Sequence, residues 1–322
     1  MIKINNSKKN NLNLMPLIIL IILIVILSFL NNSFLSLNTI INIMNQVSVI
    51  GIVAIGAMIV IISGGIDFSS GYGLAAIGML SSFIYSLNIL PNNIFIFALL
   101  FILFGAFIGF CNGFIITKFN ILPFIATLAM MSIMQGVSIF VNKGTMIILT
   151  EYDFISYLGH GKLFNIIPIT FIVFVIISIF VSVIMNKTKF GTYDYAIGGD
   201  EKALLYSGVN VKKYKILIYV VAGICTGLAS MLTVSQIGMA TPSLAGSVLT
   251  DAIAATCIGG TSMSGGKGNI FGTVIGSFII ILIGTALTYL NIAAEMQNVF
   301  KGCVILFAVA FDALFENIKK RR

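Results

Sequence analysis

The sequence predicts an all-α polytopic membrane protein with about ten transmembrane helices, and three observations carry this prediction. Of the 322 residues, 59% are hydrophobic and only 9% are charged, and the mean hydropathy is +1.11. Soluble domains carry about 25% charged residues, so this chain cannot cover its surface with solvated groups. Its apolar runs are continuous and about 20 residues long, as membrane helices are, whereas barrel strands alternate with a period of two.

The apolar runs divide the chain into ten predicted spans, which form one transmembrane domain over residues 1–322. The first span follows three lysines, as the core of a signal peptide does. No small-x-small cleavage motif follows it, so we expect an uncleaved anchor. Glycine is dense in the third and eighth spans, which are short. The predicted spans are residues 15–31, 40–63, 71–90, 94–113, 121–141, 166–185, 215–235, 249–262, 269–289 and 297–314.

The lysine and arginine residues predict the orientation. Ten spans place both termini on one side of the membrane. Of the 18 Lys and Arg residues, only Lys143, Lys162 and Lys301 fall on the opposite side. Positive charge marks cytoplasmic loops, so both termini should be cytosolic. The net charge of +8 then reflects topology, and no basic soluble domain remains to bind nucleic acid.

The sequence offers no catalytic, metal or cofactor site. The four cysteines lie in or at the ends of spans without CxxC spacing, and His160 is the only histidine. The stretch GGTSMSGGKGN, residues 259–269, resembles a phosphate loop, but Thr261 replaces its first glycine and Gly268 replaces its Ser or Thr. We therefore expect that the chain is not an enzyme. We expect residues 259–269 to form a tight cytosolic turn. Its glycines are Gly259, Gly260, Gly265, Gly266 and Gly268.

The stretch SGGIDFSSGYG, residues 63–73, places Asp67 between two apolar runs. An ionised aspartate at mid-membrane costs about 2.5–3.5 kcal/mol, so it needs protein or water around it. Three roles stay open: a cap for the third span, a residue of a gate or substrate path, or a contact to a coupling region. Gly64 and Gly65, which a cap does not need, and the polar Ser69 and Ser70 favour a charge-dependent role.

Asp251 raises the same question at the start of the eighth span. A cap at the outer face and a role in the path are equally consistent with its position. The external loop predicted at 142–165, between the fifth and sixth spans, holds His160 and two acids but no complete metal or catalytic set.

The longest cytosolic loop, predicted at 186–214, contains a short helix. Asp200 is a good N-cap, Glu201 suits the first turn, and Gly208 can end the helix at C′. A helix of two turns is not stable alone. It therefore needs a partner surface or the lipid headgroups, and the residues leave these alternatives equal. Its small, partly apolar face comprises Ala203, Leu204, Leu205 and Ser207.

Four blocks, in chain order, resemble the permeases of ribose-type ABC importers of monosaccharides, and the resemblance extends from about residue 40 to residue 312. The blocks are GGIDFSSG (64–71), PFIATLAMMSIMQG (123–136), AIGGDEKALLYSGVNVKKYK (196–215) and TDAIAATCIGGTSMSGGKGNIFGTVIG (250–276).

This resemblance implies the membrane subunit of an ATP-driven importer, which forms the translocation path for a small sugar. The implied partners are a second permease copy or paralogue, a cytosolic ABC ATPase that binds the ATP, and an extracytoplasmic sugar-binding protein. The implied location is the inner, or cytoplasmic, membrane of a bacterium. The helix from Ala203 to Gly208 would dock on the ATPase, and glycine-dense spans would let the paired permeases approach closely.

The chain departs from the family pattern at two places. Gln135 stands where the second block usually carries Arg, and Ser69–Ser70–Gly71 replaces Ser-Val-Gly. Gln135 joins Asp67, Ser69, Ser70 and Asp251 in the predicted path or gate. Nucleosides, autoinducer sugars and branched amino acids are alternative cargoes of related permeases. A secondary transporter without an ATPase, or a purely structural subunit, also stays open, although the acids lie at span edges and not inside the spans.

Overall fold

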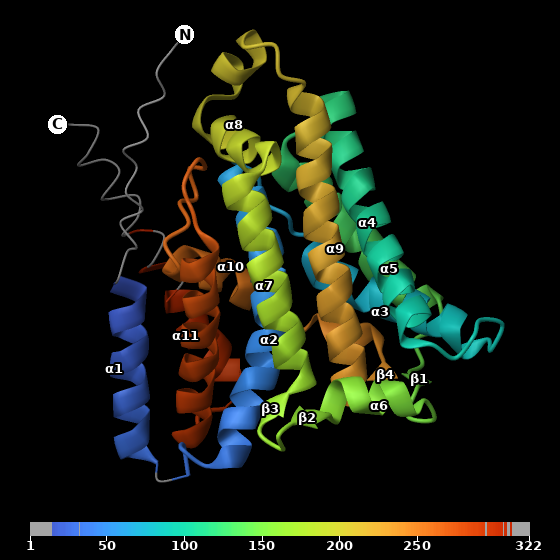
Figure 1. The fold of residues 1–322 in the computed structure, drawn as a ribbon, viewed down its shortest axis with the longest axis vertical. Coiled ribbons are helices and arrows are strands. Elements are labelled where there is room, and N and C mark those ends of the chain that lie inside the picture. Colours follow the sequence, from blue (N-terminus) through green and yellow to red (C-terminus); the bar gives the residue numbers. More distant parts are fainter. Residues whose placement is uncertain (1–14, 32, 294, 305, 308–309, 311–322) are drawn as a thin grey trace.

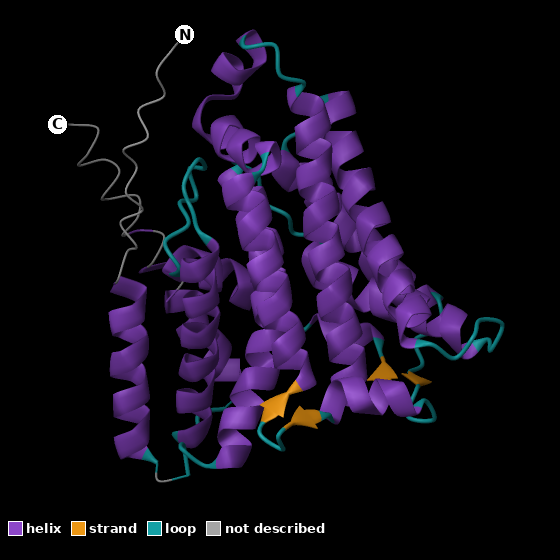
Figure 2. Cartoon of the chain, in the orientation of Figure 1, coloured by secondary structure: helices purple, strands orange, loops and turns teal. Residues whose placement is uncertain are grey.

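The described part of the chain is mostly helical (Figures 1 and 2). The structure is a computed structural model that describes residues 15–31, 33–293, 295–304, 306–307 and 310. Each predicted span up to residue 289 corresponds to a helix. These helices are α1 (Met15–Leu30), α2 (Leu37–Ile62), α3 (Ser70–Ser86), α4 (Ile94–Phe119), α5 (Pro123–Phe140), α7 (Ile169–Lys187), α9 (Val211–Ile237), α10 (Val248–Ile258) and α11 (Ile270–Tyr289).

Among the described helices, six are long and apolar enough to cross a membrane: α2, α4, α5, α7, α9 and α11. α1 and α10 are shorter apolar helices. Residues 295–304 are helical where the tenth span was predicted, and the rest of that span lies mostly outside the described residues. The structure therefore supports a multi-helix membrane protein, and the number of ten spans stays a prediction.

α2 is the central helix, because most of its residues are buried. α4 and α9 pack closely through glycines: a Cβ at Gly105 would overlap the carbonyl oxygen of Gly223, and one at Gly109 would overlap that of Tyr219. Small residues that let helix backbones approach are typical of membrane interfaces. These glycines of the fourth and seventh predicted spans are used for packing within the chain.

At one end of the molecule, the predicted external loop is structured (Figure 1). It contains the short helix α6 (Asp153–His160), which packs against the C-terminal part of α9, where a Cβ at Gly159 would overlap the Ser235 carbonyl. Strand β1 (Ile147–Ile148) pairs with β4 (Met239–Ala240), and β2 (Lys162–Leu163) pairs with β3 (Ile167–Pro168). The 3-10 helix η1 (Pro242–Ala245) leads into α10.

At the opposite end lies α8 (Lys189–Tyr206), which occupies most of the connection predicted at 186–214, so the helix in this connection is longer than the sequence predicted. Thr188 begins this helix, because its hydroxyl accepts from the Phe190 amide at 3.2 Å. Asp200 has extended backbone angles (φ −157°, ψ 96°) and divides α8 at a kink. Only the part after the kink is the short helix that the sequence predicted.

Candidate functional site

Three glycine pairs that are distant in sequence meet where α2 ends. Gly64 has φ +82°, and the α10–α11 turn contains Gly265 (φ +83°) and Gly266 (φ +72°). The Gly266 amide donates to the Ile62 carbonyl at 2.8 Å. In α8, a Cβ at Gly198 would overlap this same carbonyl oxygen. We call Gly64–Gly65, Gly198–Gly199 and Gly265–Gly266 the glycine junction.

The other predicted turn glycines are used in two ways. Gly260 has φ +85°, which favours glycine. Gly259 packs against the backbone of Gly272 in α11, and Gly268 lies against Thr261 and Ile62. The turn therefore fixes α10, α11 and the end of α2 at close range.

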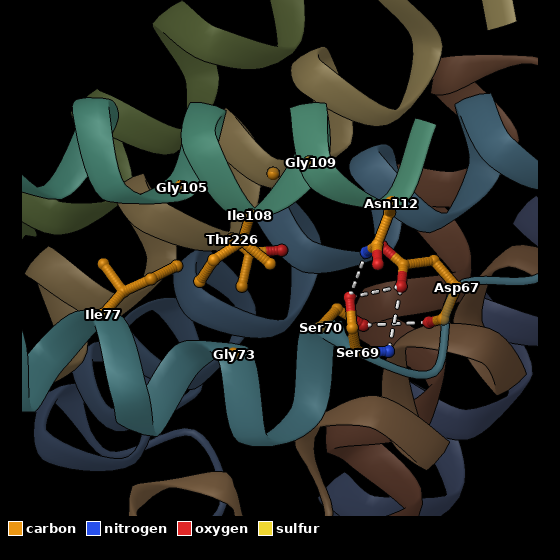
Figure 3. Close-up of a pocket in the computed structure, with 11 residues that line it drawn as sticks. Asp67, Ser69, Ser70, Gly73, Ile77, Gly105, Ile108, Gly109, Asn112 and Thr226 are labelled. Carbon is orange, nitrogen blue, oxygen red and sulfur yellow. Dashed lines mark hydrogen bonds between the residues drawn. The ribbon is translucent and has the colours of Figure 1, made fainter. Parts of the chain in front are cut away.

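Asp67 lies beside this junction in a hydrogen-bonded turn (Figure 3). Its Oδ1 accepts from the Ser69 amide at 2.9 Å and from the Ser69 hydroxyl at 2.6 Å. The Ser70 hydroxyl donates to the Asp67 carbonyl at 3.2 Å, and Asn112 of α4 donates to Ser69 Oγ at 2.7 Å. The predicted bond from the Ser69 amide is thus present, although the N-cap position of α3 is Ser69 itself.

The space beside this turn is small. Asp67 is 7% exposed, and the adjoining cavity between α3, α4 and α9 holds about 10 Å³. A cavity of this size takes about one water molecule. The buried Oδ1 of Asn112 has no partner in the described chain and lies at this cavity, so it is a suitable acceptor for such a water. A sugar does not fit here in this conformation.

Gln135 lies apart from Asp67. It is exposed on α5, and its Nε2 donates to the Tyr72 hydroxyl of α3 at 3.1 Å. This hydrogen bond connects α5 to α3. The role of Gln135 in the path stays a prediction.

The short helix after the kink in α8 has the ends that the sequence suggested. Asp200 Oδ1 accepts from the Ala203 amide at 3.0 Å, and Gly208 has φ +81°. Glu201 forms an ion pair of 2.7 Å with Lys215 of α9. The apolar face differs from the expected one, because Leu204 packs against the core. The exposed apolar residues are Leu205 (59%) and Tyr206 (87%).

Sequence reasoning missed Asp194 in the first half of α8. This carboxylate is completely buried, and neither of its oxygens has a hydrogen-bond partner among the described residues. Burial raises the pKa of Asp194 well above its usual value. The neighbouring Tyr195 donates to the Gly268 carbonyl at 2.8 Å, and burial together with the Asp194 charge raises the pKa of Tyr195 to about 12.

Asp251 lies in the first turn of α10 and is 2% exposed. Its Oδ2 accepts from the Ser247 hydroxyl at 2.8 Å and from Lys301 Nζ at 2.9 Å. Its buried Oδ1 has no partner among the described residues. Lys301, which the sequence assigned to the external side without a role, therefore belongs to an ion pair between α10 and the 295–304 helix.

The ion pair borders a cavity of about 340 Å³ between α2, α10, α11 and the 295–304 helix. This cavity lies at the end of the molecule where α2 begins, whereas Asp67 lies beyond the end of α2. The structure thus separates the predicted path residues into two places. We call the larger space the polar cavity. Its polar lining outside the ion pair comprises Thr39, Asn42, Gln46, Ser247, Thr285, Thr288, Tyr289 and Gln297.

No group of three His, Cys, Asp or Glu residues that could hold a metal ion occurs in the described part of the chain. The site features are instead those of a membrane transport subunit: a polar cavity between apolar helices, and a capped helix at the opposite end.

Comparison with known proteins identifies the family. The chain belongs to the family of the branched-chain amino acid transport system permease component, which matches residues 39–309. It is 39% identical over 261 residues to the ribose import permease protein RbsC of Bacillus subtilis, covering 80% of each chain. No solved structure matches the chain.

Two further relatives carry other names. The chain is 36% identical over 287 residues to the galactose/methyl galactoside import permease protein MglC of Salmonella typhimurium, covering 81% of this chain and 82% of the relative. It is 32% identical over 261 residues to the D-allose transport system permease protein AlsC of Escherichia coli, covering 81% and 78%. With the six apolar helices, this membership makes the chain a multi-pass permease of the bacterial inner membrane.

Proposed function

We propose that this protein is the membrane subunit of an ATP-driven importer and forms the translocation path for a small sugar. The names of three relatives, import permeases for ribose, allose and galactose, support this substrate class. In this proposal the whole chain, residues 1–322, is one permease domain with about ten spans and cytosolic termini. A second permease copy or paralogue, a cytosolic ATPase that binds the ATP, and an extracytoplasmic sugar-binding protein complete the importer.

The observation that carries the proposal is the tip of α8. Leu205 and Tyr206 are exposed on a helix with an N-cap at Asp200 and a left-handed glycine at Gly208. Exposed apolar residues on a short helix suit a partner surface or the lipid headgroups, and membership of a permease family favours a partner protein. The first part of α8, before the kink at Asp200, reaches the end of α2 through Gly198, so the tip is adjacent in the chain to a segment that contacts the membrane helices.

An ion-coupled carrier without an ATPase is the second candidate. The sequence argued against it because the acids lie at span edges, yet Asp67, Asp194 and Asp251 are all buried. Buried acids are the feature expected of such a carrier, so their position no longer excludes it. Family membership and the exposed tip of α8 favour the importer.

The experiment that tests the proposal compares two exposed tyrosines at opposite ends of the molecule. Tyr206→Ser at the tip of α8 should abolish binding of the ATPase and sugar-stimulated ATP hydrolysis, with the membrane level of the permease unchanged. Tyr157→Ser on α6 is the matched control, because Tyr157 is also exposed (68%), and it should bind the ATPase like the parent. Full ATPase binding and stimulation in Tyr206→Ser would refute docking through this tip.

A further inference from the structure

One face of α2 lines the polar cavity, and this face is polar and more exposed than the rest of the helix. Thr39, Asn42 and Gln46 follow one another at steps of three and four residues, which places them on one side of a helix. Asn42 and Gln46 are exposed in this single chain, while most of the remaining α2 is buried. Amides that faced lipid would lack hydrogen-bond partners, so this face must meet water, a polar ligand or another protein.

The opposite wall of the cavity carries a second polar set. Thr285, Thr288 and Tyr289 of α11 line it on one helix face. The Tyr289 hydroxyl lies 2.9 Å from Thr39 Oγ1, which closes the end of the cavity where α2 begins. Gln297 of the last described helix also lines the space and donates to the Ile292 carbonyl at 3.0 Å. The cavity thus presents hydroxyl and amide groups from three elements.

The ion pair supplies the charged groups. Asp251 is bound through Oδ2 alone, and its buried Oδ1 has no partner among the described residues. This oxygen is enclosed by the protein, so Lys301, whose side chain is 16% exposed, is the member of the pair that a ligand can reach. Lys301 is an ammonium with three donors. Because the two charges cancel, the cavity favours a neutral ligand over an ion.

We infer that the polar cavity is a binding site for one monosaccharide during its passage through this subunit. This inference rests on the proposed importer function and names the place where its cargo is held. The Lys301 ammonium donates to a sugar hydroxyl, and the amides of Asn42 and Gln46 bind further hydroxyls. The volume of about 340 Å³ lies in the range of small-molecule sites, about 300–1,000 Å³.

The first test compares two asparagines of the same helix. Asn42 lines the cavity, whereas Asn45 accepts from the Thr170 hydroxyl at 2.7 Å on the side toward α7. Each is replaced by alanine in the complete importer, and uptake of labelled D-ribose, D-allose and D-galactose is measured in proteoliposomes. Loss of one hydrogen bond corresponds to about a tenfold change, so Asn42→Ala should raise the KM of uptake about tenfold. Asn45→Ala, compared per assembled complex, should leave KM unchanged.

The second test exchanges the charges. The double variant Asp251→Lys with Lys301→Asp keeps an ion pair but moves the carboxylate to the other helix. A purely structural pair predicts recovered assembly and recovered uptake, which would overturn the inference. A sugar site predicts recovered assembly and binding-protein-stimulated ATP hydrolysis with uptake still lost.

The outcomes separate the two proposals. If the parent importer accumulates sugar and both asparagine variants have the parent KM, the cavity inference is wrong and the importer function stands. If the charge-exchanged protein does not assemble, the asparagine pair alone decides the matter. A parent complex that accumulates none of the three sugars contradicts the proposed function, and the inference with it.

Discussion

At the scale of single residues, the chain holds three buried aspartates in three different settings. Asp67 is satisfied by Ser69, Asp251 is half satisfied by Lys301 and Ser247, and Asp194 is unpartnered among the described residues. An unpartnered buried charge is costly, whereas a paired one is tolerated. The three settings therefore predict different responses to the same kind of substitution.

Asp67→Asn should transport like the parent, and Asp67→Ala should lose about 0.5–2 kcal/mol of stability. The reason is that an asparagine Oδ1 can accept both bonds from Ser69, while alanine accepts none. The sequence favoured a charge-dependent role for Asp67. Because the structure shows a hydrogen-bonded turn beside a cavity for one water, we now expect Asp67 to act as a hydrogen-bond acceptor that stabilises this turn. The measurement is sugar uptake in vesicles, normalised to folded protein. If Asn and Ala are equally inactive while folded, the negative charge itself is required.

Asp194→Asn should flatten the dependence of stability on pH. In the folded chain the pKa of Asp194 is raised by burial, so the folded state binds this proton more tightly than the unfolded state does. Stability from this group is then present below the unfolded pKa of about 3.9 and is lost as pH rises toward the folded pKa. Thermal unfolding of both proteins between pH 5 and pH 8, values chosen as about one to four units above that reference, measures the effect.

The apolar variant Asp194→Leu sharpens this test. Removing an unsatisfied buried group should gain about 1–3 kcal/mol, with the larger gain at the higher pH. Asp153→Asn on the exposed start of α6 serves as the control and should change neither quantity. Equal pH slopes in the parent and Asp194→Asn would contradict a raised pKa of Asp194 in the folded protein.

At the scale of elements, the glycine junction connects α8 to α2 and to the α10–α11 turn. Gly198→Ala should weaken coupling, because its Cβ would overlap the backbone at Ile62 and Gly266, which cannot move as a side chain can. Overpacking of this kind costs about 1–3 kcal/mol. Gly199→Ala is the matched control, since nothing lies within 4 Å of its Cβ position. Thermal unfolding and sugar-stimulated ATP hydrolysis should change in Gly198→Ala alone, and equal behaviour of the two variants would contradict the junction.

Much of the element order follows from the sequence, because long apolar runs and the glycines between them mark where helices begin and end. The cap at Asp200 and the turn at Gly208 were also readable, since both depend on local residues. The first half of α8 was missed because its composition is mixed and tertiary contacts stabilise it. The pairing of Asp251 with Lys301 joins positions 50 residues apart, and nothing in local spacing encodes such a contact.

The polar cavity shows the same limit at the level of the site. The steps between Thr39, Asn42 and Gln46 were visible in the sequence and could have indicated a polar helix face. Thr285 and Thr288 of α11 lie opposite to this face only because α2, α10 and α11 pack together. The sequence therefore predicted Asp251 as a candidate without its neighbours.

At the scale of the whole molecule, the lysines predict which side of the membrane is cytosolic, and residues near the two ends of α9 can test this orientation. Ser207 lies just before α9, and Ser156 lies on α6, which packs at the other end of α9. A cysteine at Ser207 should react with an impermeant reagent from the cytosolic side only, and a cysteine at Ser156 from the opposite side only. The experiment uses a background in which the four native cysteines are replaced. Labelling of both positions from one side would refute the predicted topology.

The central claim is that this chain forms the path of an ATP-driven sugar importer. The most direct measurement is accumulation of labelled D-ribose, D-allose and D-galactose in proteoliposomes that contain the permease, its ATPase and its binding protein. The account predicts accumulation of at least one sugar against its gradient, with a strict requirement for ATP, for the ATPase and for the binding protein. Sugar uptake by the permease alone, driven by an ion gradient and indifferent to ATP, would contradict it.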